Sequence, residues 1–414
     1  MTENENNNEN VANENHGAAA DTDGNTVENP PVGDVSENTK QACGPADRSV
    51  PPHASKKPKK LLVFSLILFL LSAAVLVFCH FSTPFAEAYA NTVSAFLRGL
   101  LACITFALPF SLAETIVLVL PLVLIAAWIR AIVLRCFCHK RGRIALYVKR
   151  LLCALLVVVS VFINTFGVCY KRRSAADLFG LDTENLSEQD ILITAAIVLE
   201  TAQSHCDLLL YNADGGTQMP YGFPELCAAT RQGYAEMLVS LPPVFSIKPV
   251  ALSEPWTYTH ISGMYFPFTG ESNINVNFPD YVTAYTVCHE TAHQLGIASE
   301  DEANFFAFLA CIFSGDDYLR YAGCLNVFEY LSADIAAQSA ANLLSSMDAR
   351  IVGELKAYSA FFEKYRTSKA AVVASAANNA YLQSQGVSAG VRSYSEVTKL
   401  VTAYFKKNMP EYYR

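Results

Sequence analysis

Two histidines four residues apart are the residues of this 414-residue chain best suited to chemistry. His289 and His293 stand in the sequence His-Glu-Thr-Ala-His, within a stretch expected to be helical over residues 281–295. In a helix, residues i and i+4 lie on one face, one turn apart, so both imidazoles can bind one zinc ion. Glu290 then lies beside the first ligand, where it can take a proton from a zinc-bound water. The pattern predicts hydrolysis that uses a zinc-activated water.

A third ligand is expected shortly after this helix. Gly296 is the expected stop of the first helix, and a second helix is expected to begin near Ser299, which has the capping-box spacing with Glu302. Residues 305–313 of the second helix are nearly all apolar, so it is expected to be buried. A buried helix that begins with three acids beside a histidine pair calls for a cation. One of those acids is therefore expected to bind the zinc.

The two motifs together resemble a known class of enzyme. His-Glu-x-x-His followed by Glu-x-x-Ala-Asn on the next helix is similar to zinc metallopeptidases of the gluzincin type. The resemblance implies that Glu300 is the third zinc ligand and that Glu302 is the capping glutamate. It also implies that Asn304 contacts a zinc ligand without binding the metal itself. The alternative exchanges the two acids and makes Glu302 the ligand.

The chain also resembles the family of bacterial membrane proteins called domain of unknown function 3810 (DUF3810), from its first apolar run almost to its end. The shared segments are GMYFPFTGE at 263–271, HETAHQLG at 289–296 with EDEAN at 300–304, and NAYL at 379–382 with GVRSY at 390–394. The family name states no activity. The resemblance implies a membrane-anchored zinc peptidase with a zincin-like fold.

Charge and apolar residues divide the chain into three zones. Residues 1–60 carry a net charge of −4 and contain no Leu, Ile, Phe, Tyr or Trp, so they are expected to be disordered. Residues 61–173 are apolar with a net charge of +9. Residues 174–414 carry −13, which makes nucleic acid a poor partner. The third zone is expected to be the peptidase domain that holds the zinc motif.

The apolar zone predicts about three transmembrane helices, over residues 61–81, 113–136 and 150–169. Each run is long enough to cross roughly 30 Å of hydrocarbon as a helix. Residues 93–111 are apolar but interrupted by Arg98, so an interfacial or re-entrant stretch is expected there, with a fourth span as the alternative. With three spans, the distribution of Lys and Arg places the tail in the cytoplasm and the C-terminal domain outside the cell membrane. A fourth span would reverse that result.

Other residues are candidates for supporting roles. Residues 271–278 alternate between polar and apolar, which predicts a half-buried strand that lies beside the metal or is merely structural. In zincins, such an edge strand pairs with the extended substrate. Glu271 is a candidate partner for a ligand histidine. Tyr265, Tyr285 and Tyr394 are candidates to polarise the oxyanion, although core packing is an open alternative for each.

These patterns predict a mainly α fold: N-terminal transmembrane helices, followed by a zincin-like α+β domain dominated by helices, with a small sheet. The expected function is that of a membrane-anchored zinc metallopeptidase, with Zn²⁺ as cofactor and a peptide or protein as substrate, in contact with membrane lipid. Three alternatives stay open. They are a non-catalytic zinc-stabilised membrane sensor or binding protein, a signalling peptidase switched through its spans, and a structural protein that carries the motif by chance.

Overall fold

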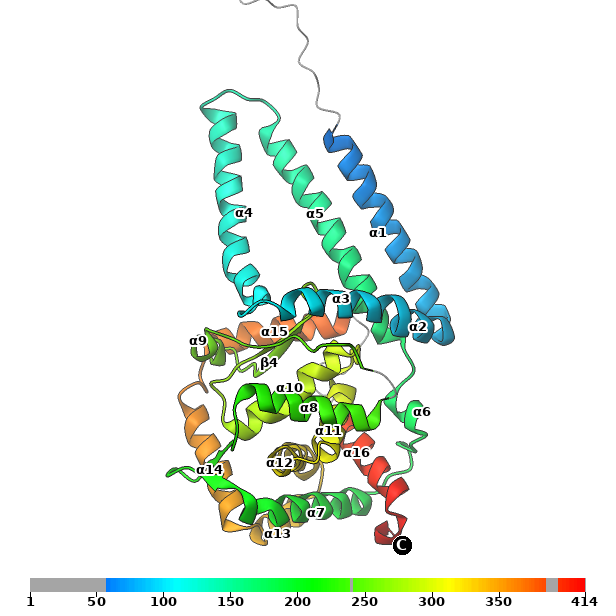
Figure 1. The fold of residues 1–414 in the computed structure, drawn as a ribbon, viewed down its shortest axis with the longest axis vertical. Coiled ribbons are helices and arrows are strands. Elements are labelled where there is room, and N and C mark those ends of the chain that lie inside the picture. Colours follow the sequence, from blue (N-terminus) through cyan, green and yellow to red (C-terminus); the bar gives the residue numbers. More distant parts are fainter. Residues whose placement is uncertain (1–56, 239–240, 385–393, 414) are drawn as a thin grey trace, which may run out of the picture. The chain divides into compact units, whose positions relative to one another are not determined.

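The structure is a computed structural model that describes residues 57–238, 241–384 and 394–413 (Figure 1). The chain divides into two units, Met1–Ala54 and Ser55–Arg414, and the described helices and strands belong to the second. The polar tail predicted over residues 1–60 lies outside the described residues as far as residue 56. The described chain is mainly helical with a small sheet, so the predicted fold class is confirmed.

Within the described residues, four stretches are long and apolar enough to cross a membrane, judged by length and composition. Their large apolar side chains are widely exposed, as expected of helices that face lipid. This agrees with association of the chain with a membrane. The four stretches are Lys60–Phe81, Thr83–Phe106, Leu112–Cys136 and Arg143–Thr165.

The second of these stretches is broken and runs in a different direction from the others. It consists of α2 (Thr83–Tyr89), a π-helical turn (Ala90–Ser94) and α3 (Ala95–Phe106). Figure 1 shows α2 and α3 running across the ends of α1 (Lys57–Phe81), α4 (Leu112–Cys136) and α5 (Arg143–Thr165). That course resembles the interfacial stretch expected over residues 93–111, but the number of spans and their sidedness stay predictions.

A three-stranded sheet lies between α3 and the helix that carries the histidine pair. Its strand order is β3-β5-β4, with β3 (Ile247–Pro249) parallel and β4 (Gly263–Phe266) antiparallel to β5 (Glu271–Ile274). The half-buried strand predicted over residues 271–278 is wrong in two respects. The strand ends at Ile274, and all four of its residues are buried, because helices cover both faces of the sheet. The edge strands are β3 and β4.

The remaining helices, apart from α9 and α15, contribute to one core around α12 (Asp317–Ala333), which Figure 1 shows nearly end-on. Its largest fully buried side chains are mostly aromatic residues and leucines, and they come chiefly from the two helices after the histidine helix. The strands β1 (Leu210–Tyr211) and β2 (Thr217–Gln218) form a separate antiparallel pair. The helices are α6 (Ala175–Phe179), α7 (Glu188–His205), α8 (Phe223–Met237), α9 (Ser253–Thr257), α10 (Asp280–Gln294), α11 (Glu300–Phe313), α12 (Asp317–Ala333), α13 (Ala337–Ser345), α14 (Ala349–Glu363), α15 (Lys369–Ser384) and α16 (Tyr394–Asn408).

Charged side chains of the sheet fasten the apolar helices to the C-terminal part. Lys248 on β3 donates through Nζ to the carbonyls of Phe106 and Leu108, at the C-terminal end of α3. Glu271 on β5 accepts hydrogen bonds from the backbone nitrogens of Leu112 (3.0 Å) and Ala113 (2.8 Å), at the start of α4. Each charge has the sign that stabilises the helix end it meets. The two parts are therefore joined by helix capping as well as by apolar packing.

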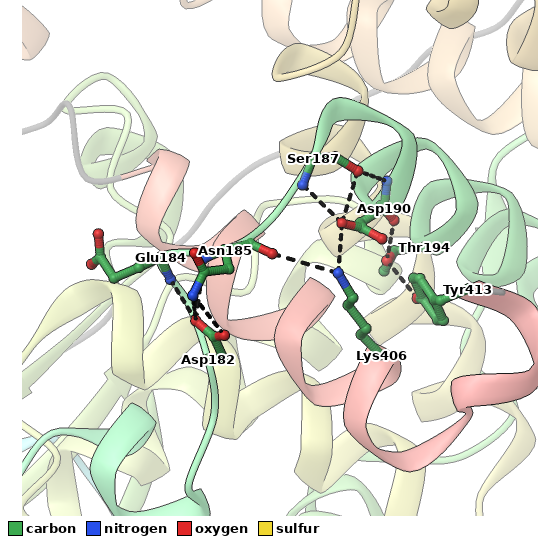
Figure 2. Close-up of polar contacts among 8 residues, drawn as sticks. All are labelled: Asp182, Glu184, Asn185, Ser187, Asp190, Thr194, Lys406 and Tyr413. Carbon is green, nitrogen blue, oxygen red and sulfur yellow. Dashed lines mark hydrogen bonds and ion pairs between the residues drawn. The ribbon is translucent and has the colours of Figure 1, made fainter.

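Figure 2 shows how α16 is held against the N-terminal end of α7. Asp190 Oδ2 accepts from the backbone nitrogen of Ser187 (2.8 Å) and pairs with Lys406 Nζ of α16 (2.9 Å). Thr194 and Tyr413 share a further hydrogen bond of 2.7 Å. Burial alone would raise the pKa of Asp190, but these hydrogen bonds and the lysine hold it below its usual range. The carboxylate thus caps α7 and joins it to the C-terminal helix.

We expect Asp190→Ala to lower the free energy of unfolding by about 1–2 kcal/mol at pH 7, the usual cost of a lost helix cap. Because the folded pKa is depressed, this contribution is present above the unfolded pKa and is lost as the pH falls below about 4. Thermal unfolding at pH 7 and at pH 3.5 measures it. Glu396→Gln, which removes an exposed ion pair on α16, is the control and should change little. A deficit that is equal at both pH values would contradict the prediction.

Candidate metal centre

Helix α10 places the two histidines on one face. It runs from Asp280 to Gln294 and ends where Gly296 adopts a φ of +87°, a left-handed conformation that favours glycine. The predicted stop at this glycine agrees with the structure. The Nε2 atoms of His289 and His293 lie 3.2 Å apart, and the two rings are almost perpendicular. The i, i+4 spacing therefore brings both imidazoles to one point.

Helix α11 adds a carboxylate to the pair. Glu300 is its first residue, and Glu300 Oε2 lies 3.3 Å from His289 Nε2 and 3.6 Å from His293 Nε2. One ligand atom from each of the three residues lies within 4.8 Å of the others. Within the described ranges, this is the group of histidine, cysteine and acidic side chains with the geometry to hold a metal ion.

The Nδ1 nitrogen of each histidine ring lies within hydrogen-bond distance of an acceptor. His289 Nδ1 lies 2.9 Å from Oδ1 of Asn304, and His293 Nδ1 lies 2.7 Å from the carbonyl oxygen of Ile297. Each Nδ1 then carries the proton, because its partner can only accept one. Both Nε2 lone pairs face each other and the Glu300 carboxylate. Three converging lone pairs repel unless a proton or a metal ion lies between them, so the donor set fits a metal ion.

Charge and burial act in opposite directions at this group. Burial lowers the pKa of His293, but the Glu300 carboxylate outweighs it and raises that pKa to about 9. Burial likewise raises the pKa of Glu300, but the two histidines hold it far below its usual range. The group is therefore suited to hold positive charge between its members.

Glu290 is buried beside this group with one oxygen free. Its side chain is 4% exposed, its Oε2 has no hydrogen-bond partner, and the backbone N–H of Tyr265 donates to the carboxylate. Burial raises its pKa, and the neighbouring histidines offset part of the rise. Strand β4 approaches this closely because Gly263 has no side chain: a Cβ there would lie 2.7 Å from Glu290 Oε1. The edge strand and the glutamate are thus in direct contact.

The end of α5 forms a wall of the site. The ring of Phe166, just after α5, lies 5.9 Å from that of His293 and 5.3 Å from that of Tyr265. The Tyr265 hydroxyl is buried without a hydrogen-bond partner, and burial raises its pKa. Phe166 thus contacts the rings of both Tyr265 and His293, and the Tyr265 hydroxyl is enclosed by apolar neighbours, so a role in polarising the oxyanion stays a prediction.

Several residues named from the sequence lie elsewhere. Glu302 accepts a hydrogen bond of 2.7 Å from the backbone nitrogen of Ala175, and burial raises its pKa to about 7. The capping box predicted for Ser299 and Glu302 is absent, because the Ser299 hydroxyl donates to Asp301 instead. Both carboxylate oxygens of Glu271 accept from the start of α4, so this residue caps a helix instead of supporting a ligand histidine.

The two remaining tyrosines have different outcomes. The Tyr285 hydroxyl donates to the carbonyl oxygen of Asn304 at 2.9 Å, so it braces the backbone behind the ligands. The side chain of Tyr394 lies outside the described residues. Sequence reasoning missed Gly263, Phe166 and Arg98 as parts of the site. Of these, Arg98 had a signal: it is a charged residue within an apolar stretch, which is costly without a function.

Fold and site together define a class: a mainly helical chain, consistent with membrane association, whose His-His-Glu group could hold a metal ion. The family described as "Protein of unknown function (DUF3810)" matches residues 89–402, most of the chain. The chain therefore belongs to this family, and the resemblance to DUF3810 is confirmed. No curated protein and no solved structure matches it.

Proposed function

We propose that the protein is a membrane-anchored zinc-dependent metallopeptidase. The observation that carries this proposal is the convergence of His289, His293 and Glu300 on one point, with the carboxylate of Glu290 buried next to it. Zinc ligands at about 2.0–2.2 Å in a tetrahedron stand roughly 3.4 Å apart. The separations of 3.2, 3.3 and 3.6 Å between the ligand atoms support zinc as the ion.

Bound zinc would lower the pKa of a coordinated water to about 7 and polarise the scissile carbonyl. Glu290 is then the general base: its free oxygen accepts the proton of the attacking water and later gives it to the leaving amine. The backbone N–H of Tyr265 holds the carboxylate in place. Asn304 and the carbonyl of Ile297 keep the two imidazoles in the tautomer that leaves Nε2 free.

The substrate is proposed to be an extended peptide or protein segment that pairs with the edge of β4. In the described chain no strand pairs with that edge, and Gly263 and Tyr265 lie directly against Glu290. An extended chain added there would run past the site, with backbone hydrogen bonds providing the affinity. This role was predicted for residues 271–278, and it passes to β4 because β5 is the central strand.

A direct experiment tests the proposal on the full-length protein in detergent. The purified chain is expected to contain one zinc per molecule and to cleave members of a proteome-derived peptide library. A chelator should stop the cleavage, and added Zn²⁺ should restore it. Less than about half an equivalent of zinc after reconstitution would refute the metal site.

The site is proposed to face the outside of the cell membrane, with the tail in the cytoplasm and lipid around the spans. The basic residues in and beside the loop that joins α4 and α5 support this orientation, because Lys and Arg are enriched in cytoplasmic loops. Protease treatment of intact cells checks it, because residues 174–414 should be digested. Full protection of that domain while a known external protein is cut would reverse the orientation.

A further inference from the structure

A buried arginine of the apolar zone reaches the end of the metal-binding helix. Arg98 lies on α3, and its side chain is 3% exposed. Its Nε donates to the carbonyl oxygen of Gln294 and its Nη2 to that of Leu295, both at 3.2 Å. These are carbonyls of the last turn of α10, which have no partner within the helix. Arg98 therefore caps the helix that carries both histidines.

The same guanidinium group caps the end of α5. Arg98 Nη1 donates to the carbonyl oxygen of Thr165, the last residue of α5, at 3.0 Å. It also donates to Ser94 Oγ (2.6 Å) and lies 3.2 Å from Cys169 Sγ. One side chain thus joins the end of an apolar, membrane-length helix to the end of the metal-binding helix.

Electrostatics explains why an arginine lies at this junction. Each helix C-terminus carries a partial negative charge of roughly half an electron, so two such ends repel when they meet away from water. A guanidinium has five N–H donors in a planar fork and stays ionised, so it can satisfy several carbonyls and neutralise both ends. Its own burial is tolerable for the same reason. Lysine has the charge but not the fork.

The cap lies one residue from a candidate ligand. Gln294 directly follows His293, and the carbonyl of Ile297 accepts the hydrogen bond that orients the His293 ring. Gly296 lies between Gln294 and Ile297 and packs directly against the arginine: a Cβ at this position would lie 2.5 Å from Arg98 Nη2. The turn that fixes the outer hydrogen bond of His293 is therefore folded against the guanidinium.

We propose that Arg98 is a positioning residue for the metal centre and makes metal affinity depend on how α3 and α5 pack. This rests on the proposed function, because it takes the His289, His293 and Glu300 group to be a metal site. Arg98 acts through the last turn of α10 and does not touch the metal. A displacement of the end of α5 would loosen that turn and with it the orientation of the His293 ring.

The test measures Zn²⁺ affinity by chelator competition, and the absorption spectrum of the Co²⁺-loaded protein, on the full-length chain. Arg98→Met keeps the length of the side chain but removes the donors. It is expected to weaken Zn²⁺ binding about tenfold, the lower end of what outer partners of a ligand contribute. It should also change the Co²⁺ bands, because the His293 ring is no longer fixed. Arg98→Lys should lie between Arg98→Met and wild type.

A further variant separates positioning from general destabilisation. Thr105→Val is the matched control: Thr105 is buried on the same helix and hydrogen-bonds Ser246 and the Thr269 carbonyl, away from α10. It should lower the unfolding temperature and leave zinc affinity and the Co²⁺ bands unchanged.

The outcomes are distinct. Unchanged affinity and bands in Arg98→Met, or an equal loss in Thr105→Val, would overturn the positioning role while the metal site stands. Wild-type protein that binds neither ion would overturn the proposed function, and the positioning role with it.

Discussion

Glu300→Gln is expected to lower Zn²⁺ affinity more than about 100-fold, while Glu302→Gln leaves it close to that of the wild type. Replacing partners that only orient a ligand costs 10- to 100-fold, so loss of a ligand should cost more. Glu300 Oε2 lies within 3.6 Å of both histidine nitrogens, and a neutral amide there is a poor substitute for a carboxylate. Chelator competition on the full-length protein gives the two affinities.

The two substitutions form a matched pair. Glu300 and Glu302 stand two residues apart in the first turn of α11, and each change replaces one carboxyl oxygen by an amide nitrogen. Glutamine at position 302 keeps an oxygen that accepts the hydrogen bond from the backbone of Ala175, so folding should be preserved. The opposite result, with metal lost only in Glu302→Gln, would make Glu302 the ligand. Loss in both variants would show that the charge of the turn matters and not one ligand.

Local periodicity predicted the part of the site that lies on one helix. His289, Glu290 and His293 are related by the geometry of a single turn, so their relative positions follow once the helix is recognised. Glu300 follows after a short loop, and this loop begins where Gly296 ends the helix. Such short-range relations need no knowledge of the rest of the fold.

Long-range contacts were not predictable from the same pattern. Polar and apolar alternation suggested a half-buried strand at residues 271–278, but burial of both faces depends on helices that pack from distant parts of the chain. Glu271 looked like a partner for a histidine and instead caps α4. Arg98 meets the Gln294 carbonyl across 196 residues, a separation that no local spacing encodes. A single sequence shows that an acid or an arginine is present, but it does not show which distant residue that side chain contacts.

The sequence predicted the long apolar helices and an interfacial stretch between the first two of them, while the number of spans stays a prediction. Length and hydropathy located helices α1, α4 and α5, because a run of apolar residues reports its own length. The stretch Thr83–Phe106 is similar in length to these helices, yet a π-helical turn at Ala90–Ser94 interrupts it. Its Arg98 hydrogen-bonds a backbone carbonyl of the C-terminal part. Composition alone could not distinguish a crossing helix from one that lies across the others.

Glu290→Gln is expected to reduce peptide cleavage by about 10²–10⁴-fold, the usual contribution of a general base, while zinc stays bound. The amide has nearly the shape of the carboxylate, so the Tyr265 N–H keeps an acceptor, but glutamine cannot take the proton of the attacking water. Zinc per chain and the rate of cleavage of a peptide chosen from the library screen are measured on the same preparation. A loss of rate with full zinc content separates the base from the ligands.

The control for this variant lies on the same helix. Thr291 is fully buried next to Glu290, and its hydroxyl bonds only to the backbone of Val287 one turn earlier. Thr291→Val should therefore keep both zinc and cleavage within a few-fold of the wild type. If Glu290→Gln cleaves as fast as the wild type, Glu290 is not the base. If the wild type binds zinc but neither the wild type nor Glu290→Gln cleaves any peptide, the metal site is not catalytic. It then stabilises a binding or sensor domain.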